Sequence, residues 1–387
     1  MSLGVLFCCR PAYGHVYPLL PLAMACRDAG HRVLFGTGEG FRPRLRELGF
    51  RAERVGISID EADRLALRED PGLNALPREE RWRFGVVVFG DVLARRTLED
   101  LHPLLEGAAP DLLVYDETDV GAAAAAHRAG VPAVAHSLGR RLPDRVRRAV
   151  LERLAEVARA YEIEAFGSDL FEANAYLDIC PPSLQDNSAS EPRERIPLRP
   201  VAPAGPADAV PEWVAGVRSR PLVYLTLGTY VSGQVESLRA AAIGLGTLNV
   251  DALVTVGPDG DPSALGPLPD SVQVERFVPQ GVLLPRVDVV AHHGGSGTML
   301  GALAHGLPQL VLPHGADQFL NAQALLDCGA GRRLLPEEIT ADAVAHAVRA
   351  LLSEPGYRDA ARGLAVEIAA MPAPAETVPK LEQQAAG

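Results

Sequence analysis

Short apolar runs alternate with amphipathic stretches along the first part of the chain. Such runs, rich in β-branched residues, predict buried strands, and the helix-period segments between several of them predict covering helices. The predicted strands are Gly4–Cys9, Arg32–Gly36, Arg51–Val55, Leu112–Tyr115 and Ala133–His136. Regular alternation of strand and helix is typical of βαβ units that share a parallel sheet.

A second series of the same kind follows residue 221. It comprises Leu222–Leu227, Ala252–Val256, Val272–Glu275, Val287–Ala291, Gln309–Leu312 and Arg332–Leu335. Between the two series, residues 192–221 are rich in Pro, Ala and Gly, a composition that stiffens a chain without building a core. The sequence therefore predicts an α/β protein with two Rossmann-like, doubly wound parallel-sheet domains in tandem.

We place the first domain at residues 1–205 and the second at residues 206–372. Residues 373–387 are expected to form a last helix that packs back on the first domain. A chain of 387 residues is too long for one core, and a prior of roughly 150 residues per domain agrees with two domains. A content of 48% hydrophobic and 22% charged residues is that of an ordinary globular protein.

The net charge of −12 argues against nucleic acid or an anionic membrane as a partner, since both require a basic surface. Six arginines nevertheless form one basic cluster: Arg140, Arg141, Arg145, Arg147, Arg148 and Arg153. We interpret this cluster as the solvated face of an amphipathic helix rather than as a site for an acidic partner or a phosphate.

The cysteines and the first residues of the chain indicate the expected cellular compartment. The five cysteines are odd in number and show no CxxC spacing, which argues against a disulfide framework or a zinc site. No apolar run approaches the length of a membrane span, and Met1 leads into a strand without the basic region of a signal peptide. The expected location is the cytoplasm, and the sequence gives no indication of the oligomeric state.

The stretch 277–323 carries the strongest chemical signal, because an apolar strand runs into a glycine-rich turn that opens a helix. The N-terminus of a helix favours an anion, and glycines let the backbone approach its oxygens. His293, Gly294, Gly295, Gly297 and Thr298 follow the fourth strand of the second half, while Thr226 and Thr229 flank the end of its first strand. In a doubly wound sheet these two strands are neighbours, so both loops are expected to face one diphosphate.

Several of these polar residues are open to other interpretations. A zinc or haem site at HHGGSG is disfavoured, because adjacent histidines on a strand point to opposite faces and His292 is then packed in the core. The pair Asp259 and Asp261 could hold a metal, but its Pro/Gly/Asp context is typical of a turn. Asp317 and Gln318 suit sugar hydroxyls, and a helix cap formed by Asp317 is almost equally compatible with the local sequence.

In the first half, His15 follows the first strand and Asp116 directly follows the fourth. These strands are neighbours at the switch point of a doubly wound sheet, so the two side chains are expected to face each other. An imidazole held by a carboxylate can act as a general base. A lone histidine in a loop is usually structural, but its pairing with Asp116 favours catalysis.

With these motifs, the chain resembles the inverting, metal-independent nucleotide-sugar glycosyltransferases of the GT-B fold, in particular the actinobacterial enzymes that glycosylate antibiotics. The resemblance spans essentially the whole length and is strongest over residues 277–323. Its motifs occur in order as GHVYP, LTLGT, FVPQ, HHGGSGT and ADQ. A GT-B fold implies that the two domains face each other across a cleft.

The resemblance implies roles for single residues. His15 would be the base that deprotonates the acceptor and Asp116 its orienting partner, while Asp317 and Gln318 would bind the donor sugar. Phe277 would stack on the pyrimidine where plant relatives have Trp. The nucleotide and diphosphate would be held by Thr226, Gly228, Thr229, Phe277, Val278, Gln280, His293, Gly294, Gly295, Ser296, Gly297 and Thr298.

The donor and acceptor are expected to be small molecules. Plant enzymes that use UDP-sugars carry a Glu eight residues past the diphosphate-binding His, whereas this chain has Gly301. A deoxyribose lacks the 2′-hydroxyl that such a Glu grips, so we favour a dTDP-deoxysugar over a UDP-sugar as co-substrate, with no metal. The aglycone pocket is expected in the first domain, with candidates Trp82, Phe84, Phe89, His136 and Phe171, although such residues are often core.

Three alternatives stay open. The protein could be a UDP-hexose-dependent transferase of the same fold, a GT-B nucleotide-sugar epimerase that needs no acceptor, or a non-catalytic partner of a glycosyltransferase. The intact His15, Asp116 and HHGGSGT loop argue against the last of these. Neither the acceptor nor the attacking atom, whether O, N or C, is indicated by the sequence.

Overall fold

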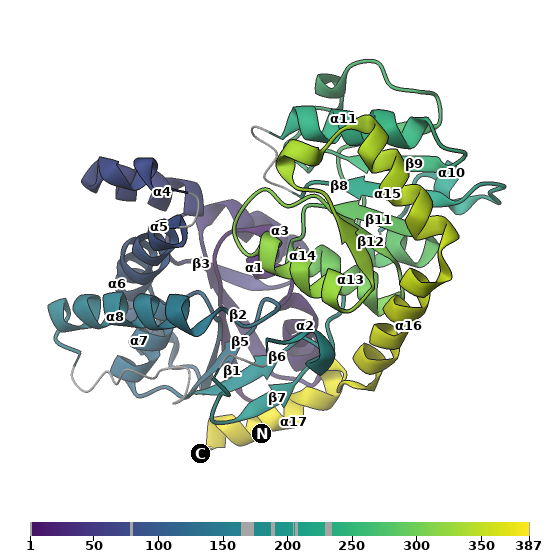
Figure 1. The fold of residues 1–387 in the computed structure, drawn as a ribbon. Coiled ribbons are helices and arrows are strands. Elements are labelled where there is room, and N and C mark those ends of the chain that lie inside the picture. The colour runs from purple at the N-terminus through teal and green to yellow at the C-terminus, as the bar shows by residue number, and fades with distance from the viewer. Residues whose placement is uncertain are drawn as a thin grey trace. The chain divides into compact units, whose positions relative to one another are not determined.

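A computed structural model describes residues 2–77, 80–163, 174–186, 190–203, 205, 208–228 and 234–386. Its contacts divide the chain into two compact units (Figure 1). Unit 1 consists of Met1–Cys180, Gln185–Arg199 and Pro372–Gly387, and unit 2 of Pro181–Leu184 and Pro200–Met371. The last segment of the chain therefore belongs to the same unit as the first.

Unit 1 contains a sheet of parallel strands in the order β3-β2-β1-β4-β5-β6-β7. The strands are β1 (Gly4–Cys8), β2 (Arg32–Thr37), β3 (Arg51–Arg54), β4 (Leu112–Asp116), β5 (Ala133–His136), β6 (Ala175–Asp178) and β7 (Arg195–Pro197). β1 and β4 are direct neighbours, with Cys8 opposite Tyr115. Because the chain leaves β1 in one direction and returns beside it at β4, the switch point of the sheet lies between these two strands.

Nine helices accompany this sheet among the residues described: α1 (Tyr13–Val16), α2 (Leu20–Asp28), α3 (Arg42–Glu47), α4 (Ile59–Glu69), α5 (Trp82–Val87), α6 (Leu93–Ala108), α7 (Val120–Ala129), α8 (Asp144–Ala160) and α17 (Pro374–Ala386). One face of the sheet packs on α6, α7 and α8 through a cluster that includes Leu6, Leu113 and Leu98. Phe7, which follows Leu6, instead stacks on Phe35 with ring centroids 5.4 Å apart. This alternation buries both faces of the sheet, as expected for a parallel sheet.

The terminal helix α17 packs on α2 and contacts β4. Its Glu382 lies 3.2 Å from the Nε2 atom of His31, a residue that is only 7% exposed. The Nδ1 atom of His31 accepts a hydrogen bond from the backbone N–H of Leu3. Nδ1 is therefore the acceptor, so the ring proton resides on Nε2, the atom nearest Glu382, and this contact brings the end of the chain close to the start of β1.

Unit 2 contains parallel strands in the order β10-β9-β8-β11-β12-β13. They are β8 (Leu222–Thr226), β9 (Asp251–Thr255), β10 (Val272–Glu275), β11 (Val289–His292), β12 (Gln309–Val311) and β13 (Gly331–Arg333). Its helices are α10 (Glu212–Ala215), α11 (Val235–Gly246), α12 (Gln280–Leu283), α13 (Ser296–Ala304), α14 (Gln318–Asp327), α15 (Ala341–Ser353) and α16 (Pro355–Ala370). The switch point lies between β8 and β11, which are direct neighbours.

Two apolar clusters cover the two faces of this second sheet. Val223 and Leu225 of β8 pack with Leu238 of α11 on one face. Leu222 and Tyr224 of the same strand pack on the other face against residues of α12 and α13. The alternation follows from the two-residue period of a strand. The pairing of β8 with β11 places their carboxyl ends side by side.

The predicted fold class, two doubly wound parallel-sheet α/β domains, is confirmed, and every predicted strand is present with its ends shifted by at most two residues. Two further strands were missed. β6 has four residues and β7 has three, and β7 lies within the segment interpreted as linker. Such short strands carry too few positions for a periodic signal, and the proline that ends β7 is tolerated because it lies on an edge strand.

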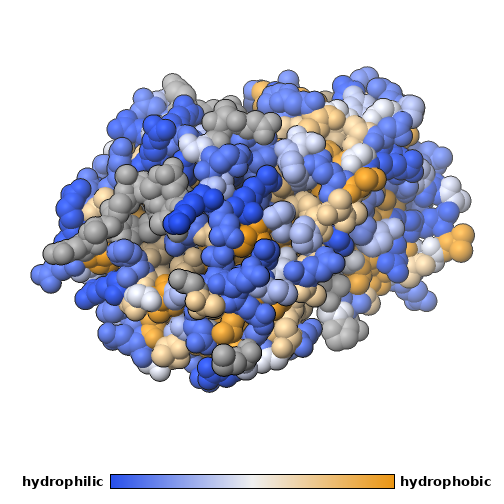
Figure 2. Space-filling view, turned by 90° about the horizontal axis from the view of Figure 1, so that it is seen from below, coloured by the Kyte–Doolittle hydropathy of each residue, from blue (hydrophilic) through white to orange (hydrophobic). Residues whose placement is uncertain are grey.

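Most charges of the arginine cluster are met within unit 1. Arg148 lies 3.7 Å from Asp144 and keeps its side chain 71% exposed, as a solvated helix face requires. The interpretation is wrong for Arg141, which precedes α8, is buried and pairs with Glu191 at 2.9 Å. On the face shown in Figure 2, hydrophilic side chains predominate and apolar ones appear in small groups between them. No helix among the described residues is long and apolar enough to cross a membrane.

One prediction tests the packing of α11 on α15. A Cβ atom at Gly244 would lie 2.3 Å from the carbonyl oxygen of Ala341, whereas a Cβ at Gly363, on the exposed side of α16, would meet nothing within 4 Å. We expect Gly244→Ala to lower the free energy of unfolding by about 1–3 kcal/mol because the helices must separate. Gly363→Ala is the matched control and should raise it by up to about 1 kcal/mol. Thermal melts of both variants measure this, and equal melting temperatures would contradict it.

Candidate active site

The first half-site lies where β1 and β4 end. His15 is carried by α1 directly after β1, and Asp116 is the last residue of β4. The Nδ1 atom of His15 lies 2.9 Å from Oδ2 of Asp116, with the side chains 15% and 0% exposed. The adjacency of two strands 100 residues apart in the chain thus brings an imidazole and a carboxylate into hydrogen-bond contact.

Asp116 accepts several hydrogen bonds besides that of His15. The backbone N–H of Arg10 donates to Oδ2 at 3.1 Å, and the backbone N–H and hydroxyl of Thr118 donate to Oδ1 at 2.8 and 2.5 Å. Burial alone would raise the pKa of Asp116. The charge and hydrogen bond of His15, with Arg10 and Thr118, instead hold that pKa well below its usual range. The carboxylate is therefore ionised at neutral pH and has no proton to donate.

The ionised carboxylate determines the state of His15. Since Asp116 can only accept, the Nδ1 atom of His15 carries the proton of their hydrogen bond. In the neutral imidazole the lone pair then resides on Nε2, the nitrogen turned away from Asp116. This arrangement can take a proton from a hydroxyl and stabilise the resulting imidazolium.

A second buried charge is carried by Arg10, whose backbone N–H bonds Asp116. The Arg10 side chain is 1% exposed; it forms an ion pair with Asp119 at 3.0 Å and donates to the hydroxyl of Thr97 at 2.8 Å. The sequence did not predict Arg10, Thr118 or Asp119 as residues of this site. Two sequence features could have identified them: an arginine immediately follows one apolar strand, and a run of polar residues directly follows another. Charges at the carboxyl ends of parallel strands gather at one edge of the sheet.

The residues predicted for the acceptor pocket lie in different surroundings. The ring of Phe89 lies nearly parallel to the His15 imidazole, at 18° and with centroids 6.4 Å apart. Phe89 belongs to the π-helical turn Val88–Val92 between α5 and α6, and such turns often occur at functional sites. Trp82 instead lies under the guanidinium of Arg145, and Phe84, like Phe89, packs on the apolar cluster around α4. Phe171 falls outside the described residues.

His136 ends β5, opposite Asp116 on β4. It is fully buried, and its Nδ1 donates to the carbonyl oxygen of Ser137 at 2.7 Å. Its Nε2 has no hydrogen-bond partner in the described part of the chain. Burial lowers the pKa of His136 to about 4, so the ring is neutral at pH 7 and offers an acceptor nitrogen.

Glu117 was also missed. Its carboxyl group accepts hydrogen bonds from the backbone N–H of Leu138 and from the hydroxyl of Tyr176, both at 2.8 Å. Burial raises the pKa of Glu117 to about 8, so this group is mainly protonated at pH 7. It joins the ends of β4, β5 and β6.

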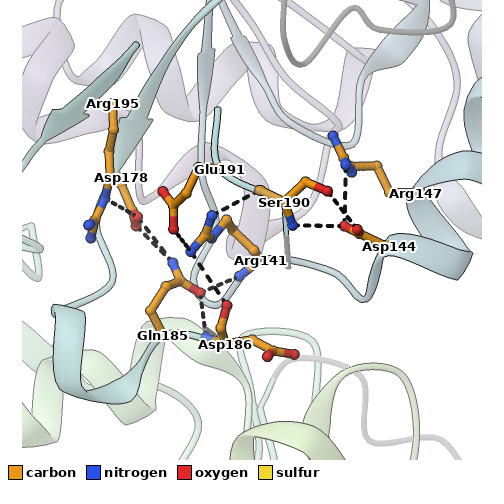
Figure 3. A network of polar contacts seen from close by, with 9 residues as sticks. All are labelled: Arg141, Asp144, Arg147, Asp178, Gln185, Asp186, Ser190, Glu191 and Arg195. Carbon is orange, nitrogen blue, oxygen red and sulfur yellow. Dashed lines mark hydrogen bonds and ion pairs between the residues drawn. The ribbon is translucent and has the colours of Figure 1, made fainter. Parts of the chain in front are cut away.

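A polar network ties together the loops that follow β5 and β6 (Figure 3). The backbone N–H of Arg141 donates to Oε1 of Gln185 at 2.9 Å, and its guanidinium donates to the carbonyl of Ser190 at 3.0 Å and to Glu191 at 2.9 Å. The amide of Gln185 donates in turn to the buried carboxylate of Asp178. The network therefore holds the loops that follow β5 and β6 together.

The second half-site lies where β8 and β11 end, and His293 is its centre. A Cβ atom at Gly228 would lie 2.7 Å from Cε1 of His293, and one at Gly295 would lie 2.4 Å from its Nε2. The imidazole is therefore confined between two glycine backbones. Its Nδ1 has no partner within the described ranges, and burial, with the neighbouring His314, lowers the pKa of His293 to about 4. The ring is thus neutral at pH 7 and can donate one N–H to an anion.

The glycine loop continues into α13. Gly294 has a φ of +97°, and a Cβ there would lie 2.9 Å from Val311, so both conformation and space require glycine. Ser296, Gly297 and Thr298 form the first turn of α13, whose first N–H groups have no acceptor within the helix. Gly297 is exposed, and a Cβ there would meet no atom within 4 Å.

Gln280 and Thr298 are brought together, with the amide nitrogen of Gln280 2.9 Å from the hydroxyl oxygen. The hydroxyl of Thr226 accepts a hydrogen bond from the backbone N–H of Gly228 at 3.2 Å and so shapes the turn after β8. Thr229 lies outside the residues that the structure describes. The first contact joins Gln280 of the FVPQ motif to the first turn of α13, and the second stays within the turn after β8.

Phe277 and Val278 are adjacent but differ in exposure. Phe277 is 40% exposed and is the only aromatic among the exposed large hydrophobic residues of the described chain. Val278 is 4% exposed and packs in the core with Leu222. Phe277 can therefore offer its ring to a ligand, while Val278 can offer only backbone groups.

Asp317 and Gln318 lie at the start of α14. Asp317 occupies the N-cap position but makes no capping hydrogen bond with its side chain. Its Oδ2 instead accepts from the hydroxyl of Ser296 at 3.2 Å and from the amide of Asn321 at 2.9 Å. Oε1 of Gln318 accepts from the backbone N–H of His314 at 2.8 Å and from that of the next residue. Asn321 was missed because its contacts depend on tertiary structure.

The remaining polar motifs are structural. His292 is fully buried, donates from Nε2 to Gln309 and accepts at Nδ1 from the backbone of Gly294, as predicted for a packed residue. Asp261 accepts from the backbone and hydroxyl of Ser263 and so forms a turn. In the described residues, no group of three or more His, Cys, Asp or Glu side chains is arranged to hold a metal ion. All five cysteines are free thiols.

Comparison with known proteins agrees with this arrangement. The chain is 34% identical to L-demethylnoviosyl transferase of Streptomyces niveus, over 96% of this chain and 95% of the relative. It is similar in structure to the glycosyltransferase VinC solved in complex with dTDP (TM-score 0.79, 26% identity, 99% of each chain). It is also similar to spinosyn rhamnosyltransferase SpnG complexed with spinosyn aglycone (TM-score 0.82, 26% identity, 98% of this chain and 100% of that one).

Both parts of the sequence match one family. Residues 24–228 match the N-terminal domain, and residues 244–384 the C-terminal domain, of the family described as erythromycin biosynthesis protein CIII-like. The two parallel-sheet domains are those of GT-B glycosyltransferases. The chain therefore belongs to the erythromycin biosynthesis protein CIII-like family of natural-product glycosyltransferases.

Proposed function

We propose that this protein transfers a deoxysugar from a dTDP-sugar to a natural-product aglycone, with inversion at the anomeric carbon. The observation that carries the proposal is the contact between His15 and the ionised, buried Asp116 at 2.9 Å. Because Asp116 binds Nδ1, the lone pair of the unprotonated imidazole resides on Nε2, the nitrogen turned away from Asp116, as a general base requires. Relatives named for the transfer of noviose, mycarose and desosamine derivatives support a deoxysugar donor.

The reaction is a single displacement. His15 Nε2 takes the proton of the acceptor hydroxyl, whose oxygen forms a bond to the anomeric carbon. The bond from that carbon to the diphosphate breaks, and dTDP leaves with the electron pair, so the configuration inverts. Asp116 holds the His15 ring and stabilises its positive charge.

The leaving diphosphate gains negative charge during the displacement. We assign its stabilisation to the N–H groups at the start of α13, to the backbone of Gly295 and Gly297, and to His293. Phe277 would stack on the thymine, and Asp317 and Gln318 would bind the sugar hydroxyls. These groups account for charge stabilisation without a divalent metal.

The preference for dTDP rests on Gly301. This residue lies in α13, and a Cβ there would be 3.9 Å from Oε1 of Gln280 and 3.0 Å from Leu284. The chain has no carboxylate at this position to pair with a ribose 2′-hydroxyl, so a deoxyribose loses nothing by lacking that group. Solved relatives in complex with dTDP support the same donor.

The first prediction concerns the base. We expect His15→Ala to lower kcat by about 10²–10⁴-fold, the usual contribution of a general base, and to leave dTDP binding within about twofold, because the nucleotide is assigned to unit 2. Asp116→Asn should also lose turnover, because an amide can donate to Nδ1 and favour the wrong tautomer. Turnover with dTDP-sugar and aglycone, together with calorimetry of dTDP, measures both.

His346 provides the matched control for this prediction, since it is an exposed histidine on α15. His346→Ala should retain the activity of the unmodified protein. If His15→Ala kept full turnover, His15 would not be the base. If sugar nucleotide were consumed equally without acceptor, the transferase assignment would give way to an epimerase.

The second prediction concerns the nucleotide. Calorimetry should show dTDP binding more tightly than UDP, by roughly tenfold, a factor that corresponds to about 1.4 kcal/mol. The reason is that no carboxylate at position 301 rewards a 2′-hydroxyl. Phe277→Ala should weaken both nucleotides alike because the ring stacks on either base. Tighter binding of UDP would reverse the donor assignment while leaving the transferase proposal intact.

The third prediction concerns metal dependence. Turnover should be unchanged after exhaustive treatment with EDTA and should not rise when Mg²⁺ is added. The physical reason is that, in the proposed site, the N–H groups at the start of helix α13 and His293 stabilise the diphosphate charge without a cation. His293→Ala is the informative variant in the same assay, because its loss should not be compensated by Mg²⁺. Loss of activity in EDTA that Mg²⁺ restores would refute a metal-independent mechanism.

A further inference from the structure

Asn321 joins the two elements to which the donor site is assigned. Its side chain is 1% exposed and lies on the first turn of α14. Nδ2 lies 2.9 Å from the carbonyl oxygen of Gly294, 3.1 Å from the hydroxyl of Ser296 and 2.9 Å from Oδ2 of Asp317, and its two hydrogens are shared among these three acceptors. The hydroxyl of Ser296 donates to the same Asp317 oxygen at 3.2 Å. One amide nitrogen therefore contacts the glycine loop, α13 and the carboxylate at the start of α14.

The contact with Gly294 restrains an unusual backbone. Gly294 has a φ of +97°, in the left-handed region, and its carbonyl group is held by the buried Asn321 amide. Its N–H is held in turn by His292 at 3.0 Å. With both polar groups bonded, the peptide planes on either side of Gly294 are fixed, and so is the direction in which the following N–H groups enter α13.

The contact with Asp317 restrains a side chain. Asn321 and Ser296 both bond Oδ2, so the carboxylate is held by one oxygen in a fixed rotation. A carboxylate accepts hydrogen bonds from hydroxyl groups, so its fixed orientation determines which hydroxyls it can bind. Removing Asn321 would leave the Gly294 carbonyl and one Asp317 oxygen without this buried donor, which is costly and releases both.

We propose that Asn321 is a positioning residue of the donor site, which sets the diphosphate-binding glycine loop and the sugar-binding Asp317 as one unit. This inference rests on the proposed function, because it takes Asp317 as a ligand of the donor sugar. Asn321 itself acts through the loop and the carboxylate. Its removal should therefore weaken recognition of the sugar more than recognition of the nucleotide.

The test compares the affinity of dTDP with that of an intact dTDP-sugar, using dTDP-glucose and dTDP-L-rhamnose as probes in calorimetry. The sugar increment is the ratio of the dTDP dissociation constant to that of the tighter dTDP-sugar. We expect Asn321→Ala to reduce the increment by about tenfold, as loss of a buried hydrogen bond to a charged group does, and to weaken dTDP by only a few fold. Asp317→Ala should reduce the increment equally, and the double variant no further.

Controls separate positioning from a general loss of stability. Gln323→Ala removes another amide of α14, one that bonds Asp327 and Arg333 rather than the loop, and should leave both affinities unchanged. If Asn321→Ala does not fold, Ser296→Ala removes another edge of the same network and should also lower the increment. Melting temperatures of all variants are measured in parallel.

The outcomes are distinct. If Asp317→Ala loses the sugar increment but Asn321→Ala and Ser296→Ala keep it, the positioning role is wrong while the donor site stands. If Asn321→Ala weakens dTDP and dTDP-sugar by the same factor, the residue is only structural. If the unmodified protein has no increment with either probe, or Asp317→Ala retains it, the sugar-binding role of Asp317 in the proposed function is itself overturned, and the inference with it.

Discussion

The first half-site depends on the complete burial of one carboxylate. Asp116 is inaccessible to water, so its charge persists only because protein groups replace the lost hydration. Those groups are the backbone of Arg10 after β1, the backbone and hydroxyl of Thr118 after β4, and the imidazole of His15. Each lies at the carboxyl end of its strand, which is possible because β1 and β4 are neighbours. The position of His15 thus follows from the need to solvate a buried charge.

The second half-site uses neutral groups in place of a charged one. His292 and His293 are both held neutral by burial, one bonded within the core and one confined between glycines. If this is the proposed diphosphate site, its neutrality avoids the cost of burying a cation before the ligand arrives. Its attraction comes from dipoles, namely the N–H groups that open α13. Asn321 belongs to this scheme, because such dipoles act on a ligand only if the backbone that carries them is fixed.

The sequence sufficed for features that depend on local pattern and on topology. Apolar runs located the strands, and the doubly wound order then placed His15 beside Asp116 and the glycine loop beside Thr226. It did not suffice for Arg10, Thr118 or Asn321, whose partners are set by packing across distant segments. Nor could the sequence distinguish Phe89 from Phe84. Phe89 lies in a π turn, which helix periodicity does not predict, and its ring is the one stacked near the His15 imidazole.

Confinement between two glycines fixes the His293 ring before any ligand binds. With the backbones of Gly228 and Gly295 on either side, the ring has little room to rotate about its side-chain bonds. Rotational freedom that a surface histidine would lose on meeting an anion has here already been lost during folding. Association should therefore carry a smaller entropic penalty at this residue. A methyl group at Gly295 would displace the ring rather than alter its charge, whereas one at Gly228, with a φ of +84°, would also strain the backbone.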